Sequence, residues 1–283
     1  IAVVLDEYGG FTTDDTGRVI VAGTVADGPG GQLGHIAVTR LRPDGSPDPE
    51  FGDAGVVVTS VVTVMGRFAV ASVDVLDDGS VIAAGIRQFD PEQVFSRALW
   101  AVKLDTAGTP VPGYGTDGVA IEEQPYTAGD PMGGFASDGS AVFSQSGFGS
   151  TFLTRVNAAG KFFDLMPGET GVPSCTAPNL VRGAVPVSPT DYVFVYDNPI
   201  FDGTKCDDTG NSGGVLVVAR QNHEGGNWWV EVIADGTRLS SDFSQQVVTV
   251  IGDSVFIGAH GPDDDPRVVR LDADSGDPVV GWG

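Results

Sequence analysis

Alternating apolar and polar positions dominate the stretch from His35 to Val61, which reads HIAVTRLRPDGSPDPEFGDAGVVVTSV. A β-branched run, a Pro-Asp-Gly segment, a Phe-Gly pair and a second β-branched run follow one another in it. Side chains alternate across a strand, and Gly, Pro and Asp favour turns. The pattern predicts two strands joined by a turn, and weaker copies of it recur along the chain.

A second pattern is an apolar strand that directly follows an Asp/Gly turn. It occurs five times at a spacing of about 60 residues, which is typical of the strand-only repeats of propellers. Its copies start at Gly17, Gly79, Gly139, Asp191 and Asp253. We therefore expect an all-β fold, a five-bladed β-propeller that forms a single domain over residues 1–283. Its approximate blades are 7–60, 61–124, 125–176, 177–236, and 237–283 plus 1–6.

Each repeat predicts four strands in chain order, from an inner strand before the Asp/Gly turn to an outer strand. The predicted outer strands start at Val56, Val119, Gly171 and Trp228. The fifth repeat ends before its outer strand, and Ile1–Leu5 has the matching pattern. We expect Ile1–Leu5 to complete the last blade, because pairing removes a free sheet edge.

This strand order places tight turns on one rim and long loops on the other. The long loops are Thr24–Gly34, Arg87–Ala98 and Asn198–Gly214. Because loops on a rigid scaffold carry most binding sites, we expect a ligand on the long-loop face. Cys175 and Cys206 fall at adjacent places on the same rim, and they predict one structural disulfide in an oxidising compartment.

The formal net charge is −23. A field of this sign repels phosphate backbones, which argues against a nucleic-acid partner. Solubility outside the cell or in high salt is one explanation of the acid excess, and divalent-cation binding is another. No apolar run approaches the roughly 20 residues that span a bilayer, so no membrane insertion is expected. The start at Ile1 suggests a processed or trimmed N-terminus, and we expect an extracellular or cell-surface protein.

The segments LRPDGSPDPEFGDAGVVV, LDTAGTPVPGYGTDGVAI and DDGSVIAAG resemble the delta-sixty repeat family of bacterial β-propeller proteins. The first two repeats match its Phe-Gly pattern closely, and RLDADSGDPVVGWG in the fifth matches in part. The third and fourth repeats diverge. The resemblance implies the propeller fold and brings no catalytic motif with it.

A basic residue stands at or near the end of each third strand: Arg40, Lys103, Arg155, Arg220 and Arg270. We expect these cations to pin acidic turns, such as those of Asp44 and Asp105, within their own blades; binding of an anion is the alternative. Aromatic residues at Phe-Gly positions are expected to wedge between blades: Phe51, Tyr114 and Trp282.

Candidate ligand-binding residues come from several places. Trp228 and Trp229 should point to opposite faces of a strand, one into the core and one, as a sugar-stacking platform, outward. Arg67 and Arg182 begin inner strands and could attract an anionic ligand at the channel mouth, with salt bridges to nearby Asp as the alternative. The remaining candidates are two histidines that could approach each other between blades five and one: His35 and His260.

Acidic clusters could hold a surface calcium ion, although none has the spacing of a helix-loop-helix calcium site, and solvated loop acids are the default. The residues are Asp207, Asp208, Asp263, Asp264 and Asp265. No Gly-x-Ser-x-Gly elbow is present, and no other cofactor is indicated.

The pattern as a whole favours a non-enzymatic binding or scaffolding module for a protein or glycan. We expect it to act as a monomer or as part of a larger assembly. The alternative is a polysaccharide hydrolase or lyase with carboxylates at the channel mouth.

Overall fold

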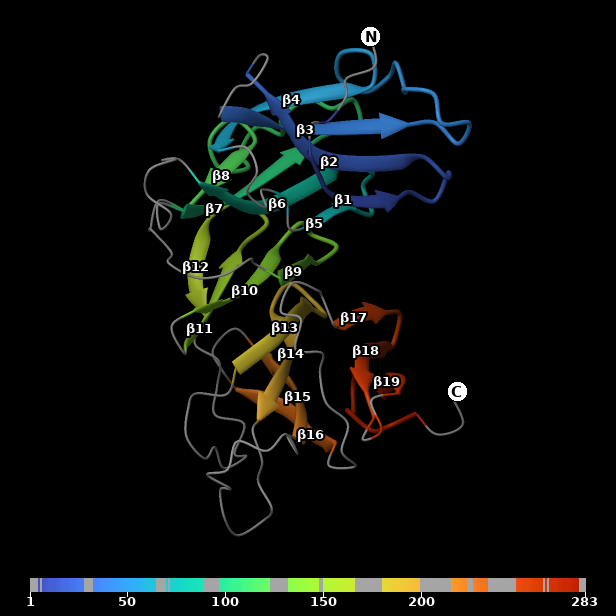
Figure 1. Cartoon of the computed structure of the whole chain (residues 1–283), viewed down its shortest axis with the longest axis vertical. Helices are drawn as coiled ribbons and strands as arrows, with labels where there is room; N and C mark the ends of the chain where they lie inside the picture. The colour runs from blue at the N-terminus through green and yellow to red at the C-terminus, as the bar shows by residue number, and fades with distance from the viewer. Residues whose placement is uncertain are drawn as a thin grey trace. The chain divides into compact units, whose positions relative to one another are not determined.

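The computed structural model describes residues 5, 7–27, 33–64, 70, 72–88, 97–122, 132–147, 150–165, 180–198, 215–222, 226–233, 248–261, 263 and 265–279. Within these ranges every regular element is a β-strand, and the strands form five antiparallel sheets (Figure 1). No helix among these residues is long and apolar enough to cross a membrane. The predicted all-β class is confirmed.

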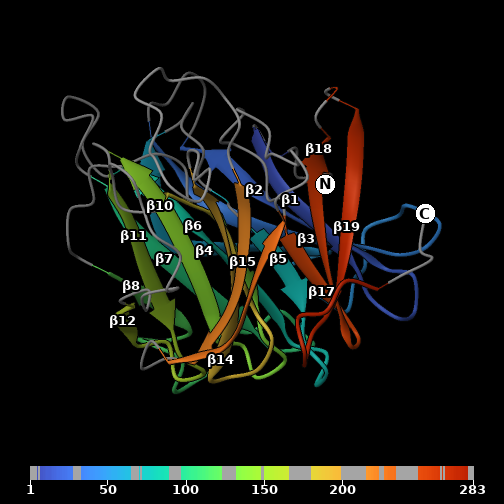
Figure 2. The ribbon, with the colours of Figure 1, turned by 90° about the horizontal axis from the view of Figure 1, so that it is seen from below.

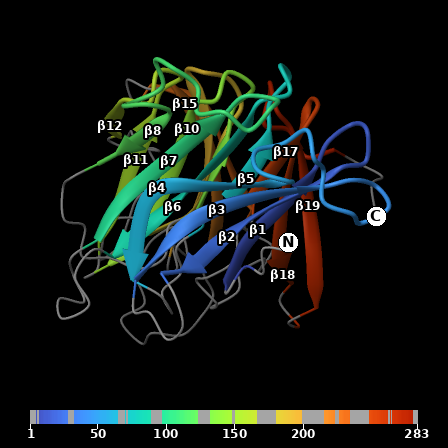
Figure 3. The same ribbon diagram turned by 90° about the horizontal axis from the view of Figure 1, so that it is seen from above.

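Strands that follow one another in the chain lie side by side in each sheet. The first sheet holds β1 (Glu7–Thr13), β2 (Val19–Ala26), β3 (Leu33–Leu41) and β4 (Val56–Val64), and Figure 3 shows this meander. The second holds β5 (Ser72–Val75), β6 (Val81–Gln88), β7 (Arg97–Leu104) and β8 (Val119–Ile121). The predicted order, from the strand before the Asp/Gly turn to the fourth strand, is confirmed for both.

The remaining sheets repeat this order. The third holds β9 (Met132–Phe135), β10 (Ala141–Gly147), β11 (Ser150–Val156) and β12 (Phe162–Leu165). The fourth holds β13 (Leu180–Pro186), β14 (Asp191–Asn198), β15 (Val215–Asn222) and β16 (Asn227–Ile233). The fifth holds β17 (Val248–Ile251), β18 (Ser254–His260) and β19 (Pro266–Asp272), and Figure 2 shows β18 beside β19.

Two details differ from the expected strand map or fall outside it. The fourth described strand of the third sheet is β12, which the chain enters directly after the turn Asn157–Gly160; the outer strand predicted from Gly171 lies outside the described residues. The fifth sheet has three described strands. Ile1–Val4, which were expected to complete it, lie outside the described residues, as does Trp282.

The chain divides into two compact units. The first contains residues 1–131, 137–140 and 156–163, and the second contains the rest. In the first unit, apolar side chains of the first two sheets form one core, which includes Ile20, Ile36, Val81 and the buried Trp100. In the second unit, a core lies between the fourth and fifth sheets, where Val193 and Val218 pack with Val255 and Leu271. The single domain over residues 1–283 stays a prediction.

Short turns are held by carboxylate or amide side chains that accept a hydrogen bond from the backbone N–H two residues later. These residues are Asp14, Asp44, Asp48, Asp78, Asp105, Asp138, Asn157 and Asp272. Part of the acid excess therefore has a structural role in the turns.

The Phe-Gly segment joins one sheet to the next within the first unit. The N–H of Gly52 donates to the carbonyl oxygen of Ala107, and the N–H of Gly115 donates in the same way to Ala159, at 2.8 and 2.9 Å. The preceding residues, Phe51 and Tyr114, are fully buried. Phe51 packs in the core shared by the first two sheets, which confirms its predicted wedge position, and Tyr114 is buried at the equivalent place.

Three cations of the row pair with acidic residues of their own repeats, as expected: Arg40 with Asp48, Lys103 with Asp78 and Arg220 with Asp191. The row also connects neighbouring sheets. Arg40 Nη1 donates to the carbonyl oxygen of Thr106, at 2.7 Å, in the next sheet's turn. Arg155 Nη2 does the same with Pro189, also at 2.7 Å. Asp44 and Asp105, which were expected to be pinned by these cations, accept at Oδ1 from their own turns.

Candidate functional site

A β-bulge in the last strand of the fourth sheet lies at the centre of the best-defined polar cluster. In the pairing of β15 with β16, Arg220 faces Trp229 and Gln221 faces Asn227, so Trp228 is the extra residue. A bulge disrupts the alternation of side chains and redirects the one that is inserted. The Trp228 side chain is 64% exposed, whereas Trp229 packs against the core between the fourth and fifth sheets.

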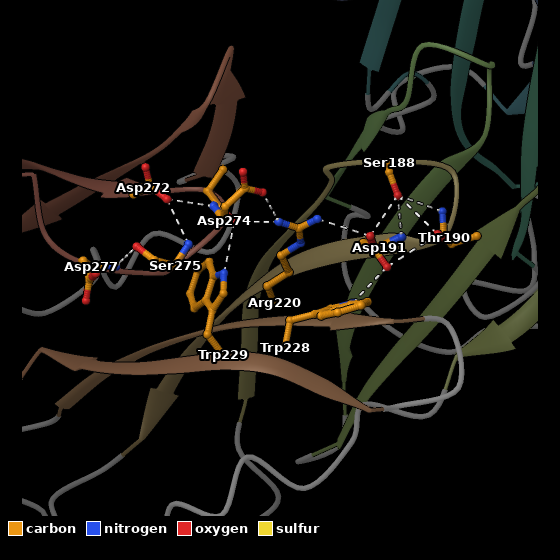
Figure 4. A network of polar contacts seen from close by, with 11 residues as sticks. Ser188, Thr190, Asp191, Arg220, Trp228, Trp229, Asp272, Asp274, Ser275 and Asp277 are labelled. Atoms are coloured by element: carbon orange, nitrogen blue, oxygen red, sulfur yellow. Dashed lines mark hydrogen bonds and ion pairs between the residues drawn. The ribbon is translucent and has the colours of Figure 1, made fainter.

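The two adjacent indoles consequently lie on the same side of the sheet, around Arg220 (Figure 4). Trp228 Nε1 donates to Asp191 Oδ1 at 3.1 Å, and Trp229 Nε1 donates to the carbonyl oxygen of Ala273 at 3.0 Å. The prediction of one core and one exposed indole is confirmed. The prediction of opposite faces is wrong, because the bulge breaks the period of two on which it was based.

Arg220 links the partners of both indoles. Its Nη1 donates to the carbonyl oxygen of Ala273 and to Asp274 Oδ1, each at 2.8 Å, and its Nη2 lies 3.3 Å from Asp191 Oδ2. One guanidinium thus faces two carboxylates. Its Nε is buried and has no hydrogen-bond partner among the described residues.

On the side of Trp228, Asp191 makes most of the contacts in this cluster. It stands at the start of β14, directly after a turn in which Ser188 Oγ accepts from the N–H of Thr190 and of Asp191. Ser188 Oγ donates to Asp191 Oδ2 at 3.1 Å. Each oxygen of the Asp191 carboxylate therefore accepts from another side chain, and the orientation of the carboxylate is held from three sides.

The turn after β19 positions the other side of the cluster. Asp272 Oδ1 accepts from the N–H of Ser275 and of Asp274, and these hydrogen bonds lower the pKa of Asp272. The turn places Asp274 beside Arg220. Gly276 has φ +79°, and a Cβ there would lie 2.6 Å from Trp229 Cδ2, so the ring packs directly on this glycine.

Arg220, Trp229 and Gly276 repeat an arrangement of the first unit. There Arg40 donates to Thr106, as Arg220 does to Ala273, and Phe51 packs on Gly108, as Trp229 does on Gly276. The fourth repeat lacks the Phe-Gly segment, and Trp229 fills the equivalent position from the strand itself. As a ligand-binding residue Trp229 stays a prediction, but the exposed ring is that of Trp228.

The histidine candidates occur in different units. His35 Nδ1 lies 3.1 Å from the carbonyl oxygen of Thr59, and its Nε2 lies 3.2 Å from Asp27 Oδ1, so both ring nitrogens face oxygen acceptors. His260 is the last residue of β18 in the second unit. The approach of His35 to His260 stays a prediction.

Other predicted site residues are described only in part. Arg182 lies in β13, with its side chain outside the described part, and Arg67 lies outside it altogether. Asp263 and Asp265 are exposed, and Asp265 Oδ2 lies 3.3 Å from Arg267 Nε. The other calcium candidates and both cysteines also lie outside the described residues: Asp207, Asp208, Asp264, Cys175 and Cys206. In the described ranges, no three His, Cys, Asp or Glu side chains gather closely enough to hold a metal ion.

The cluster around Arg220 lies at the short turns, and most of the long-loop residues lie outside the described part. Sequence reasoning placed Arg220 in the row of cations and noticed the tryptophan pair, but it did not connect the two. The available signal was the coincidence of this pair with a missing Phe-Gly segment in the same repeat.

One carboxyl of the first unit has an unusual environment. Asp74 lies on β5, and burial raises its pKa despite hydrogen bonds from its own strand and from the Thr12 hydroxyl, which lies 3.4 Å from Oδ1. Among the described carboxyls with a shifted pKa, it alone is shifted upward. Burial therefore favours the neutral form of Asp74, in contrast to the other described carboxyls with a shifted pKa.

Comparison with protein families gives a match to a β-propeller family. The model of a β-propeller domain of unknown function, DUF5122, matches residues 15–51, which span β2, β3 and the segment up to Phe51. No curated protein matches the chain. The all-β sheets and this match agree on a propeller-like fold.

Among solved structures, a mutant of puromycin hydrolase complexed with PGG matches with a TM-score of 0.52 at 16% identity, and puromycin hydrolase itself with 0.51 at 17%. Each match covers 96% of this chain and 37% of the hydrolase chain. A mutant of Synechocystis apocarotenoid oxygenase matches with 0.47 at 12% identity, over 96% of this chain and 58% of that one. At these identities the likeness concerns the fold alone, and this chain spans little more than a third of the hydrolase.

Proposed function

We propose that this chain is a non-enzymatic binding or scaffolding module carried on a β-propeller. The observation that carries the proposal is Trp228, an exposed indole whose orientation is held by Asp191 at a β-bulge. Bulges are frequent at binding sites, where they aim a side chain. The carboxylates beside it are paired with Arg220, which suits them to positioning the ring better than to proton transfer.

We further propose that the five sheets are the blades of one closed ring. Phe11, Leu33 and Val58 are exposed apolar side chains on the face of the first sheet that lies away from its core. Ile251 and Val268 are exposed on the corresponding face of the fifth sheet. Burial of both faces against each other, with residues 1–6 as the missing outer strand, would remove this surface from water.

The proposal includes the setting of the module. A disulfide between Cys175 and Cys206, an extracellular or cell-surface location and a calcium ion among the loop acids all agree with an acidic, turn-rich repeat protein. A protein or glycan on the long-loop face remains a candidate partner.

Asp74 supports one alternative, a polysaccharide hydrolase or lyase. Its raised pKa is what a general acid requires, and a glycosidase would need a second carboxylate roughly 5 to 10 Å away. This alternative accounts for Asp74 but gives no role to Trp228 or its supporting cluster.

The two functions differ in turnover. The protein would be incubated with soluble polysaccharides, and the release of reducing ends and the formation of unsaturated products would be measured. Binding of the same polysaccharides would be measured by affinity electrophoresis. If the protein is a binding module, a polysaccharide in the gel slows its migration and no cleavage product forms. Product formation that Asp74→Asn abolishes, and that the turn variant Asp44→Asn leaves unchanged, would overturn the proposal in favour of the enzyme.

A further inference from the structure

We infer that the indole of Trp228, bordered by Asp191 and Thr190, binds a neutral pyranose ring of a glycan. The inference deepens the proposed function, because it names the ligand class and a site on the short-turn rim of the fourth sheet (Figure 4). It is independent of any site on the long-loop face.

The first argument is the fixed orientation of an exposed aromatic surface. Trp228 is 64% exposed, yet its Nε1 is tied to Asp191 Oδ1. A tryptophan has two side-chain torsions, so one hydrogen bond at the ring edge removes much of its freedom before a ligand arrives. The amphipathic ring then offers a flat apolar surface with a polar edge, which suits the apolar C–H face and the hydroxyl edge of a pyranose.

The second argument is charge. Asp191 gives Oδ1 to Trp228 and Oδ2 to Arg220, and Asp274 Oδ1 also accepts from Arg220. Both oxygens of Asp191 already accept from side chains, and the guanidinium beside the indoles repels a cation. An anionic polysaccharide is disfavoured as well, since the whole chain has a formal charge of −23. A neutral ligand suits both conditions.

The third argument is the polar rim. The Thr190 hydroxyl lies 3.5 Å from the same Asp191 oxygen that accepts from the indole, so it stands next to the ring edge. Both oxygens of the neighbouring Asp191 carboxylate lie at the same edge, held by Trp228, Ser188 and Arg220. Hydroxyl and carboxylate groups beside an aromatic platform match the alternating donors and acceptors of sugar hydroxyls.

The test uses the whole chain with xyloglucan, galactomannan and laminarin as neutral probes, alginate as an anionic probe and a trimethyl-lysine peptide as a cationic one. Affinity would be measured by isothermal titration and gel retardation for the wild type, Trp228→Ala and Trp228→Phe. Phe163→Ala is the matched control, since Phe163 is an exposed aromatic residue on β12. Circular dichroism would establish that each variant is folded.

We expect a neutral probe to bind, Trp228→Ala to weaken it about tenfold or more, and Trp228→Phe to keep part of the affinity. Phe163→Ala should bind as the wild type does. If a neutral probe binds Trp228→Ala as tightly as the wild type, the proposed site is wrong, but the proposal of a binding module is unaffected. Preference for alginate or for the cationic peptide, or no retention by any neutral probe, would overturn the ligand class.

Discussion

Arg40 and Asp48 form a buried ion pair in the first unit. Arg40 Nε lies 2.8 Å from Asp48 Oδ2, and the two side chains are 3% and 4% exposed. Arg40 also lies over the Phe51 ring, 4.7 Å from its centroid, and donates to Thr106 of the next sheet. One side chain thereby holds the turn of its own sheet, the aromatic wedge and the neighbouring turn together.

Arg40→Ala should be strongly destabilising, because it leaves the Asp48 carboxylate buried without its closest cation. Breaking a buried pair in this way costs about 3–5 kcal/mol. Arg42→Ala is the matched control: its Nε lies 3.7 Å from Asp48 Oδ1, but its side chain is half exposed, and its loss should cost less than about 1 kcal/mol. Urea unfolding of both variants measures the difference, and equal losses would contradict the role assigned to Arg40.

Stability should fall in acid because turn carboxylates have lowered pKa values. Burial would raise the pKa of Asp14, but hydrogen bonds from Thr16 and Arg18 outweigh it and lower the pKa from 3.8 to about 2. A carboxyl with a lower pKa in the folded state stabilises the protein above its unfolded pKa. This contribution should disappear as the pH falls from 3.8 towards about 2.

Unfolding free energies at about pH 5 and about pH 2.5 would measure this effect. Asp14→Asn should be less stable than the wild type at the higher pH, and the difference should be clearly smaller at the lower. A constant difference between the two proteins across this range would show that Asp14 does not titrate with a lowered pKa in the folded state.

Tyr114→Phe should leave stability unchanged or raise it by about 1 kcal/mol. The Tyr114 hydroxyl is buried without a hydrogen-bond partner among the described residues, and burial raises its pKa. An unpaired buried hydroxyl costs free energy that a phenyl ring does not. The equivalent residue, Phe51, is already a phenylalanine. The reverse change, Phe51→Tyr, should therefore destabilise by about 1–3 kcal/mol in thermal or urea unfolding.

Gly276→Ala should destabilise more than Gly45→Ala, although the two glycines have φ values of +79° and +81°. A Cβ on Gly45 meets nothing within 4 Å, so this variant carries only the backbone cost of about 1 kcal/mol. A Cβ on Gly276 would strike the Trp229 ring. Equal destabilisation in chemical unfolding would mean that the ring does not pack on Gly276.

Ring closure can be tested at Ile251. If the first and fifth sheets bury their apolar faces together, Ile251→Asp should lower the unfolding free energy by about 2 kcal/mol or more, because an isolated charge would be buried. Ala158→Asp, at an exposed turn position, should stay within about 0.5 kcal/mol of the wild type. An Ile251→Asp variant as stable as the wild type would argue for an open array of sheets. Concentration-dependent dimerisation would assign this face to a second copy of the chain.

The sequence by itself determined most strands and their order within the described sheets, with the fourth strand of the third sheet as an exception. The apolar run that begins at Val81 and the Asp-Gly turn before it are local properties, since a side chain such as Asp78 caps its own turn. The wedge positions of Phe51 and Tyr114 followed from the same repeat. These features depend on residues close together in the chain and therefore recur visibly in it.

Only the tertiary structure decided which residues of different repeats meet. The contacts of Arg40 with Thr106 and of Arg220 with Ala273 join residues more than fifty positions apart, and the turn acids near each cation suggested other partners. The bulge at Trp228 depends on how β16 pairs with β15, and this pairing, rather than the alternation of the strand itself, sets the direction of both indoles. Strand pairing and packing between sheets balance many contacts at once, which is why the candidate site became visible only in three dimensions.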